Sequence, residues 1–429
     1  MSSKSILILC LMASLMGFSN PVYSQKKVVF IILDGIPADV LENTPTPNLD
    51  EIAKLGGYTK AYTGGKAGSY SETPTISAVG YNSLLTGTWA NKHNVWGNEI
   101  KAPNYNYWTI FRFFRDANSN AKLGIYSTWE DNRTKLIGEG LQETDFLKMD
   151  YSFDGFEKDT LTYPHDSQKK YIQKIDNLVS YEAAFQLKTI APDLSWVYLE
   201  YTDDMGHRYG DSPELAEAVA LADRQVGRIY ESIRYREEKF GEEWLILITT
   251  DHGRKAEDGK DHGGQSDRER EIWMITNAKE LNSYFKNYTP AMVDILPTIA
   301  SFLKIDLPEK AIKELDGVPL IGDISLINAN AEIQSGSVKL TWVPIQKTGK
   351  VTVSYASTDN FGQTGNVDNY TKIADIDLSA AEFRIPVAEL PSGKLKFWIQ
   401  GENNGVGVWL IRLRLNFAKS ITKRNLWIF

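Results

Sequence analysis

Acidic side chains and histidines, the residue types that bind divalent metals, gather in four short segments of this 429-residue chain. Three of the segments follow stretches with the pattern of buried strands, and the fourth lies in a glycine-rich loop before another such stretch. The candidate metal ligands are Asp34, Asp203, His207, Asp251, His252 and His262. Six oxygen and nitrogen ligands suit two divalent ions, with zinc as the first choice and manganese or iron as alternatives.

Ligands this far apart in the chain can meet only if the fold brings several strand ends together. Residues 27–33 form an almost continuous apolar run that ends at Asp34, which is typical of a central parallel strand. Ser212 and Pro213 begin a long amphipathic helix. Strands that alternate with helices predict an α/β fold, a parallel sheet with helices on both faces. Ligands in such folds bind beyond the carboxyl ends of the strands. The other strand candidates are residues 196–201, 244–250 and 272–276.

A nucleophile for such a site can be sought in residues 71–87, a stretch rich in hydroxyls that leads into a predicted helix. The N-terminus of a helix offers unpaired N–H groups and a partial positive charge, which suit a phosphate. A hydroxyl is a poor nucleophile at neutral pH, but metal coordination lowers its pKa. Ser77 and Thr75 are both candidates on these grounds.

These segments together resemble the alkaline phosphatase superfamily, and within it the nucleotide pyrophosphatase/phosphodiesterase (type I phosphodiesterase) branch, over residues 27–305. The resemblance implies an alkaline phosphatase-like fold with two metals. The family places its nucleophile nine residues before a Thr-Gly pair, and Ser77 stands nine residues before Thr86 and Gly87, which ranks it ahead of Thr75. The two ligand sets that the family pattern implies are Asp203, His207 and His262 for one metal and Asp34, Asp251 and His252 for the other.

Two departures from the family pattern bear on the substrate. The phosphodiesterase branch usually has threonine as nucleophile and asparagine three residues later, where this chain has Ser77 and Gly80. A phosphomonoesterase is therefore the alternative. Sulfatases need proline and arginine where this chain has Val79 and Tyr81, so a sulfatase is disfavoured. The resemblance implies a two-metal hydrolase of small-molecule phosphoric esters, first a phosphodiesterase or nucleotide pyrophosphatase, with a phosphoserine intermediate.

The sequence pattern changes after about residue 325. Apolar and polar residues alternate near the positions 338–342, 351–355 and 395–399, with turn signals between them. This pattern predicts a small C-terminal all-β sandwich similar to fibronectin type III or immunoglobulin-like modules. The predicted domains are a catalytic domain over residues 25–325 and the β-module with a basic tail over 326–429. The sequence identifies no partner for this module. A catalytically inactive protein that binds through it ranks lower, because all six ligands are present.

The N-terminus and the composition limit where the protein works and what it binds. A positive start, an apolar run over residues 6–18 and small residues before Gln25 predict a signal peptide at 1–24, and hence a periplasmic, secreted or cell-surface protein. No other stretch is apolar and long enough for a transmembrane segment. The single cysteine excludes an internal disulfide. The 47 basic and 55 acidic residues give a net charge of -8, which argues against a nucleic acid duplex as partner.

Overall fold

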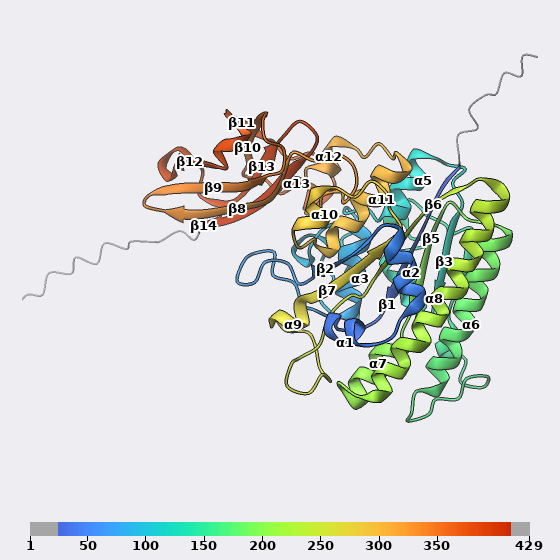
Figure 1. Cartoon of the computed structure of the whole chain (residues 1–429). Coiled ribbons are helices and arrows are strands. Elements are labelled where there is room, and N and C mark those ends of the chain that lie inside the picture. Colours follow the sequence, from blue (N-terminus) through green and yellow to red (C-terminus); the bar gives the residue numbers. More distant parts are fainter. Residues whose placement is uncertain (1–24, 413–429) are drawn as a thin grey trace, which may run out of the picture.

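The computed structural model describes residues 25–412, which form a large α/β part and an all-β part (Figure 1). The predicted signal peptide and residues 413–429 of the basic tail lie outside the described residues. Among residues 25–412, no helix is both long and apolar enough to cross a membrane.

A seven-stranded sheet with the order β2-β7-β6-β1-β5-β3-β4 forms the centre of the α/β part. The strands from β6 to β4 pair in parallel. The predicted parallel sheet is present in these five strands, and the prediction was wrong at β7, which pairs antiparallel with both β6 and β2. Parallel neighbours are usually connected by a helix that packs on the sheet, and the connection from β6 to β7 contains only the four-residue helix α9. The strands are β1 (Lys26–Leu33), β2 (Gly57–Tyr62), β3 (Leu123–Ser127), β4 (Tyr151–Phe153), β5 (Leu194–Leu199), β6 (Glu243–Thr249) and β7 (Glu271–Thr276).

Helices cover both faces of this sheet, as the sequence predicted. Val28, Phe30 and Ile32 of β1 belong to a buried core shared with α3, α5 and α11, and the alternate residues of β1 belong to a second core with α2, α6 and α8. Strand side chains alternate between faces, so a continuously apolar strand needs cover on both. These helices are α2 (Pro47–Leu55), α3 (Ser77–Thr86), α5 (Ile110–Ala117), α6 (Lys170–Thr189), α8 (Pro213–Phe240) and α11 (Ile295–Leu303). Shorter helices are α1 (Ala38–Asn43), α4 (Ala90–His93), α7 (Tyr201–Tyr209), α9 (Asp267–Arg270), α10 (Ser283–Asn287) and α12 (Glu309–Ile312).

The all-β part begins with β8 at Leu326 and contains two antiparallel sheets, of the orders β11-β10-β13-β14 and β12-β9-β8. The residues Val338, Leu340 and Trp342 are buried and alternate with the polar residues Lys339 and Thr341. A C-terminal all-β region is therefore present, and its identity as a fibronectin-like or immunoglobulin-like module stays a prediction. Its elements are β8 (Leu326–Gln334), β9 (Ser337–Pro344), β10 (Lys350–Ala356), α13 (Asn360–Thr364), β11 (Thr371–Asp377), β12 (Glu382–Pro386), β13 (Gly393–Gln400) and β14 (Gly405–Arg412).

A buried ion cluster fixes the all-β part against the α/β part. Lys396 of β13 donates to Glu314 at 2.8 Å and to Asp368 at 2.6 Å, and all three side chains are buried. Glu314 lies in the segment that leads from α12 to β8, and the Lys92 ammonium of α4 donates to its carbonyl oxygen at 2.7 Å. The cluster therefore connects a helix of the α/β part with a strand of the all-β part.

We expect Lys396→Met to lower the free energy of unfolding by about 3–5 kcal/mol, because it leaves buried carboxylates without their cation. Urea unfolding measures this change. The matched control is Lys394→Met, since Lys394 lies on the same strand, is exposed and donates to the hydroxyl of Tyr70 at 2.8 Å. Equal stability losses in the two variants would contradict this account of the ion cluster.

Candidate active site

The six predicted ligands meet at the carboxyl edge of the parallel strands. Asp34 directly follows β1, and Asp251 follows β6, the neighbour of β1. The strand predicted to end at Tyr201 ends at Leu199, and α7 begins at Tyr201. Its residues Asp203 and His207 are therefore one helical turn apart rather than in a loop, with Oδ2 and Nε2 3.2 Å from each other. His262 precedes β7, whose antiparallel direction makes it start at this same edge.

Two of the histidines present the same nitrogen to the site. Nδ1 of His252 lies 2.9 Å from the Gly253 carbonyl oxygen, and Nδ1 of His262 lies 2.8 Å from that of Thr75. A carbonyl oxygen only accepts, so each Nδ1 carries the proton and each Nε2 keeps its lone pair. Burial lowers the pKa of both rings, which favours the neutral form that binds a metal.

Two carboxylates have one oxygen held by the protein and the other without a partner. Oδ2 of Asp34 accepts hydrogen bonds from the phenols of Tyr81 and Tyr198. Oδ1 of Asp251 accepts from the backbone N–H of Gly35 at 3.0 Å. The remaining oxygens, Oδ1 of Asp34 and Oδ2 of Asp251, are buried and have no hydrogen-bond partner. Buried polar atoms are almost always paired, and a bound cation would satisfy both of these oxygens.

Burial and neighbouring charges shift the pKa values of the three clustered carboxylates in different directions. Burial raises the pKa of Asp34 well above its usual range, and the nearby charges of Asp251 and Asp203 raise it further. Burial also raises the pKa of Asp251 to about 7. Burial also acts to raise the pKa of Asp203, but the Arg254 guanidinium outweighs it and holds this pKa below its usual range. Divalent cations would supply the positive charge that lets all three carboxylates ionise together.

Asp203 lies within reach of two ligand groups. Its carboxylate forms a compact group with His207 and His262, and another with Asp34 and His252; in each group the ligand atoms lie within 4.8 Å of one another. Oδ1 of Asp203 is 4.0 Å from Nε2 of both His252 and His262. The family pattern places Asp251 with Asp34 and His252, and Oδ2 of Asp251 lies 3.2 Å from Nε2 of His252.

The two candidate nucleophiles differ in what their hydroxyls do. Ser77 is the first residue of α3, a helix buried along its whole length, and its Oγ lies 3.4 Å from Nε2 of His252. The Thr75 hydroxyl donates to the Gly264 carbonyl at 2.9 Å and accepts from the Gly263 N–H at 3.0 Å. Thr75 is thus committed to the loop that carries His262, and Ser77 faces the ligands.

The other two histidines lie outside this cluster. His93 is fully buried, with Nε2 3.0 Å from the hydroxyl of Ser83 and Nδ1 accepting from the N–H of Val95 at 3.1 Å. Burial lowers the pKa of His93 to about 3. His165 stacks on Tyr171 with ring centroids 4.3 Å apart. Neither ring contacts a predicted ligand in these interactions.

The structure adds contacts that the sequence analysis did not assign. Tyr81 and Tyr198 hold Asp34, and Arg254 holds Asp203. Oδ1 of Asn98 accepts from the N–H of Ala78 at 3.0 Å, in the first turn of α3. Arg254 directly follows the Asp-His-Gly segment, which was a signal in the sequence, but only the tertiary structure shows that its guanidinium turns back to Asp203.

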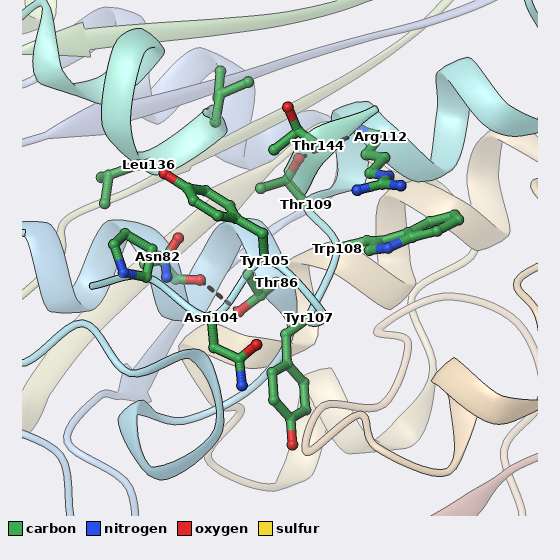
Figure 2. Close-up of a pocket in the computed structure, with 12 residues that line it drawn as sticks. Asn82, Thr86, Asn104, Tyr105, Tyr107, Trp108, Thr109, Arg112, Leu136 and Thr144 are labelled. Carbon is green, nitrogen blue, oxygen red and sulfur yellow. Dashed lines mark hydrogen bonds between the residues drawn. The ribbon is translucent and has the colours of Figure 1, made fainter. Parts of the chain in front are cut away.

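A small cavity against α3 is separate from this site. It is lined by Asn82 and Thr86 of α3 together with Tyr105, Trp108 and Arg112 (Figure 2). Its volume of about 10 Å³ has room for about one water molecule. Neither Ser77 nor any of the predicted metal ligands lines it, so this cavity is no substrate site.

A comparison with known families decides between the superfamily branches. The family model described as type I phosphodiesterase / nucleotide pyrophosphatase matches residues 28–297. The chain belongs to this family. The resemblance predicted from the motifs is thereby confirmed. The matched range contains Ser77 and all six predicted ligands.

Curated relatives match the same part of the chain. Human ectonucleotide pyrophosphatase/phosphodiesterase family member 7 is 25% identical over 276 residues, which cover 59% of this chain and 54% of that protein. The venom phosphodiesterase CdcPDE of Crotalus durissus collilineatus is 23% identical over 248 residues, which cover 54% of this chain and 26% of that protein. This chain therefore spans about half the length of the human relative and about a quarter of the length of the venom enzyme.

Solved structures share the fold at low sequence identity. The phosphonate monoester hydrolase of Agrobacterium radiobacter has a TM-score of 0.51 and 13% identity, with 90% of this chain and 89% of that chain covered. Ps i-CgsB in complex with k-i-k-neocarrahexaose has a TM-score of 0.50 and 16% identity, with 74% and 85% covered. These likenesses concern the fold alone, because one fold supports many reactions.

Proposed function

We propose that this chain is a two-metal hydrolase of small-molecule phosphoric diesters that uses Ser77 as its nucleophile. The observation that carries the proposal is the position of Ser77, whose Oγ lies 3.4 Å from Nε2 of His252 at the N-terminus of a buried helix. Family membership supports diester hydrolysis. Metal dependence is supported by the two compact groups that hold five of the ligands and by Asp251, which lies beside His252.

The donor set fits two divalent ions, zinc first and manganese or iron as alternatives. The unpartnered buried oxygens of Asp34 and Asp251 and the lone pairs on Nε2 of His252 and His262 support this fit. When bound, the metals would lower the pKa of a hydroxyl and offset the charge that develops on phosphoryl oxygens. The proposed ligand sets are Asp203, His207 and His262 for one ion and Asp34, Asp251 and His252 for the other.

Ser77 carries the covalent chemistry in this proposal. Its Oγ loses a proton to solvent and forms a bond to phosphorus as the bond to the leaving ester oxygen breaks. The leaving ester oxygen takes up the proton that Ser77 released to solvent. Water then forms a new bond to phosphorus as the bond to Oγ breaks, and the proton lost by water restores the hydroxyl of Ser77. The partial positive charge at the N-terminus of α3 suits the phosphoryl oxygens throughout.

Asn98 extends the phosphate site. Its Oδ1 is fixed by the N–H of Ala78 at 3.0 Å, which leaves the Nδ2 protons of this exposed side chain free to donate to a phosphoryl oxygen. An amide that is already oriented loses little entropy when it binds substrate. We include Asn98 as a substrate-binding residue of the proposed site.

The proposal also includes export and the division of the chain. We propose a signal peptide at residues 1–24, a catalytic domain at 25–325 and a β-module at 326–429. A periplasmic, secreted or surface location would give the enzyme access to external esters.

We expect the purified protein to show a higher kcat/KM for bis-p-nitrophenyl phosphate than for p-nitrophenyl phosphate, because its family hydrolyses diesters. A spectrophotometric assay of both compounds measures the ratio. A panel that includes nucleotides and lipid headgroup esters would then narrow the natural substrate. A higher kcat/KM for the monoester would instead assign the chain to the phosphomonoesterases.

A further inference from the structure

One arginine is fully buried next to the predicted metal ligands. The guanidinium of Arg254 contacts three other segments of the site. Its Nη2 donates to the carboxylate of Asp203 and, at 2.8 Å, to the backbone carbonyl of the same residue. Its Nε donates to the Gly35 carbonyl at 2.9 Å, and its Nη1 to that of Lys260 at 2.9 Å. Arg254 thus joins the segments that follow β1, β5 and β6 with the loop that leads to His262.

The surrounding chain makes room for this guanidinium. A Cβ at Gly206 would clash with the guanidinium carbon of Arg254, and a Cβ at Gly35 would clash with both Arg254 and Asp203. A buried charge is costly unless it is paired and hydrogen-bonded, and here one carboxylate and three carbonyl oxygens meet that requirement. The arginine is therefore built into the site.

The position of the guanidinium determines which oxygen of Asp203 stays available. Oδ1, which Arg254 holds, is the oxygen 4.0 Å from both His252 and His262. Oδ2 faces His207 at 3.2 Å. A carboxylate without this constraint has two oxygens with which to reach both ligand groups.

We infer that Arg254 is a positioning residue that restricts Asp203 to the metal held with His207 and His262. The inference rests on the proposed two-metal function. Arg254 acts by fixing the orientation of the Asp203 carboxylate and not by contact with substrate, since its guanidinium is enclosed by the protein. Loss of Arg254 should therefore weaken that metal selectively and leave the metal on Asp34, Asp251 and His252 in place.

Metal binding by the purified full chain tests this inference in Arg254→Met and Arg254→Lys. Zinc content after dialysis and competition with a chelator give the stoichiometry and the two Kd values. We expect two zinc ions in the wild type and, in Arg254→Met, an increase of about 10–100-fold in the Kd of one ion only. Arg254→Lys keeps the positive charge but lacks the planar guanidinium, so its increase in Kd should be smaller than that of Arg254→Met. It also keeps the inference testable if Arg254→Met does not fold.

The matched control is Arg268→Met. Arg268 also bridges several segments, through Asp39, Asp211 and the Lys255 carbonyl, but it contacts no predicted ligand. We expect this variant to bind both ions as the wild type does. Two ions at wild-type Kd in both Arg254 variants, or an equal weakening of both ions, would overturn the inference. A wild-type chain that binds no divalent ion would contradict the proposed function as well.

Discussion

Replacing Ser77 by alanine is expected to lower kcat/KM for bis-p-nitrophenyl phosphate by on the order of 10³-fold or more, because a reaction that loses its nucleophile keeps only the contributions of binding and electrostatics. The fold should survive. Ser77 is the first helical residue of α3 rather than its N-cap, which is Ile76, and alanine is a good helix former. Steady-state kinetics measures the loss, and circular dichroism checks the fold.

Ser77→Thr is the matched variant, since it keeps the hydroxyl and adds one methyl group to a buried position. We expect it to retain more activity than Ser77→Ala, although crowding beside His252 should slow it relative to the wild type. Wild-type turnover by Ser77→Ala would show that another group attacks phosphorus and would remove Ser77 from the mechanism.

The second large effect is expected from the metal ligands. Asp251→Asn keeps the Oδ1 that accepts from Gly35 at 3.0 Å, but it removes the charge from a carboxylate whose Oδ2 is buried without a partner. Mutating a residue that only hydrogen-bonds to a metal ligand typically lowers metal affinity or activity by about 10–100-fold. Removing the charge of a ligand itself should therefore lower kcat/KM by more than about 100-fold. Elemental analysis should show fewer divalent ions per chain.

His165→Ala is the matched control for ligand loss, because His165 stacks on Tyr171 and lies outside the ligand cluster. It should keep the metal content and the turnover of the wild type. Prolonged dialysis against a chelator should inactivate the wild type, and added zinc should restore it. Full activity of Asp251→Asn with an unchanged metal content would contradict the proposed ligand set.

The sequence predicted the parts of the fold whose signals are local. The apolar run that ends at Asp34 predicted β1, and Ser212 followed by Pro213 predicted the start of α8. The direction of β7 could not be predicted, since the apolar pattern of a strand does not record whether its neighbour runs parallel or antiparallel. The boundary after β5 was misplaced because Tyr201 favours strands in general but here begins α7.

In the candidate site too, the local signals could be predicted from the sequence and the tertiary contacts could not. The residue types and spacing of Asp203 and His207 indicated metal ligands whether they lie on a loop or a helix. The hydrogen bond from Tyr198 to Asp34 and the return of Arg254 to Asp203 depend on tertiary packing, which one sequence does not contain. Ser77 was ranked above Thr75 by family spacing alone, and the structure adds a physical reason, since the hydroxyl of Thr75 is already bonded to Gly263 and Gly264.

The central claim is that the reaction passes through a covalent bond to Ser77. Mass spectrometry of protein quenched in acid during a single turnover of bis-p-nitrophenyl phosphate tests it most directly. We predict a phosphoryl adduct on the peptide that contains Ser77, in the wild type and in Thr75→Val, and none in Ser77→Ala. An adduct on Thr75, or complete turnover without any adduct on this peptide, would contradict the claim.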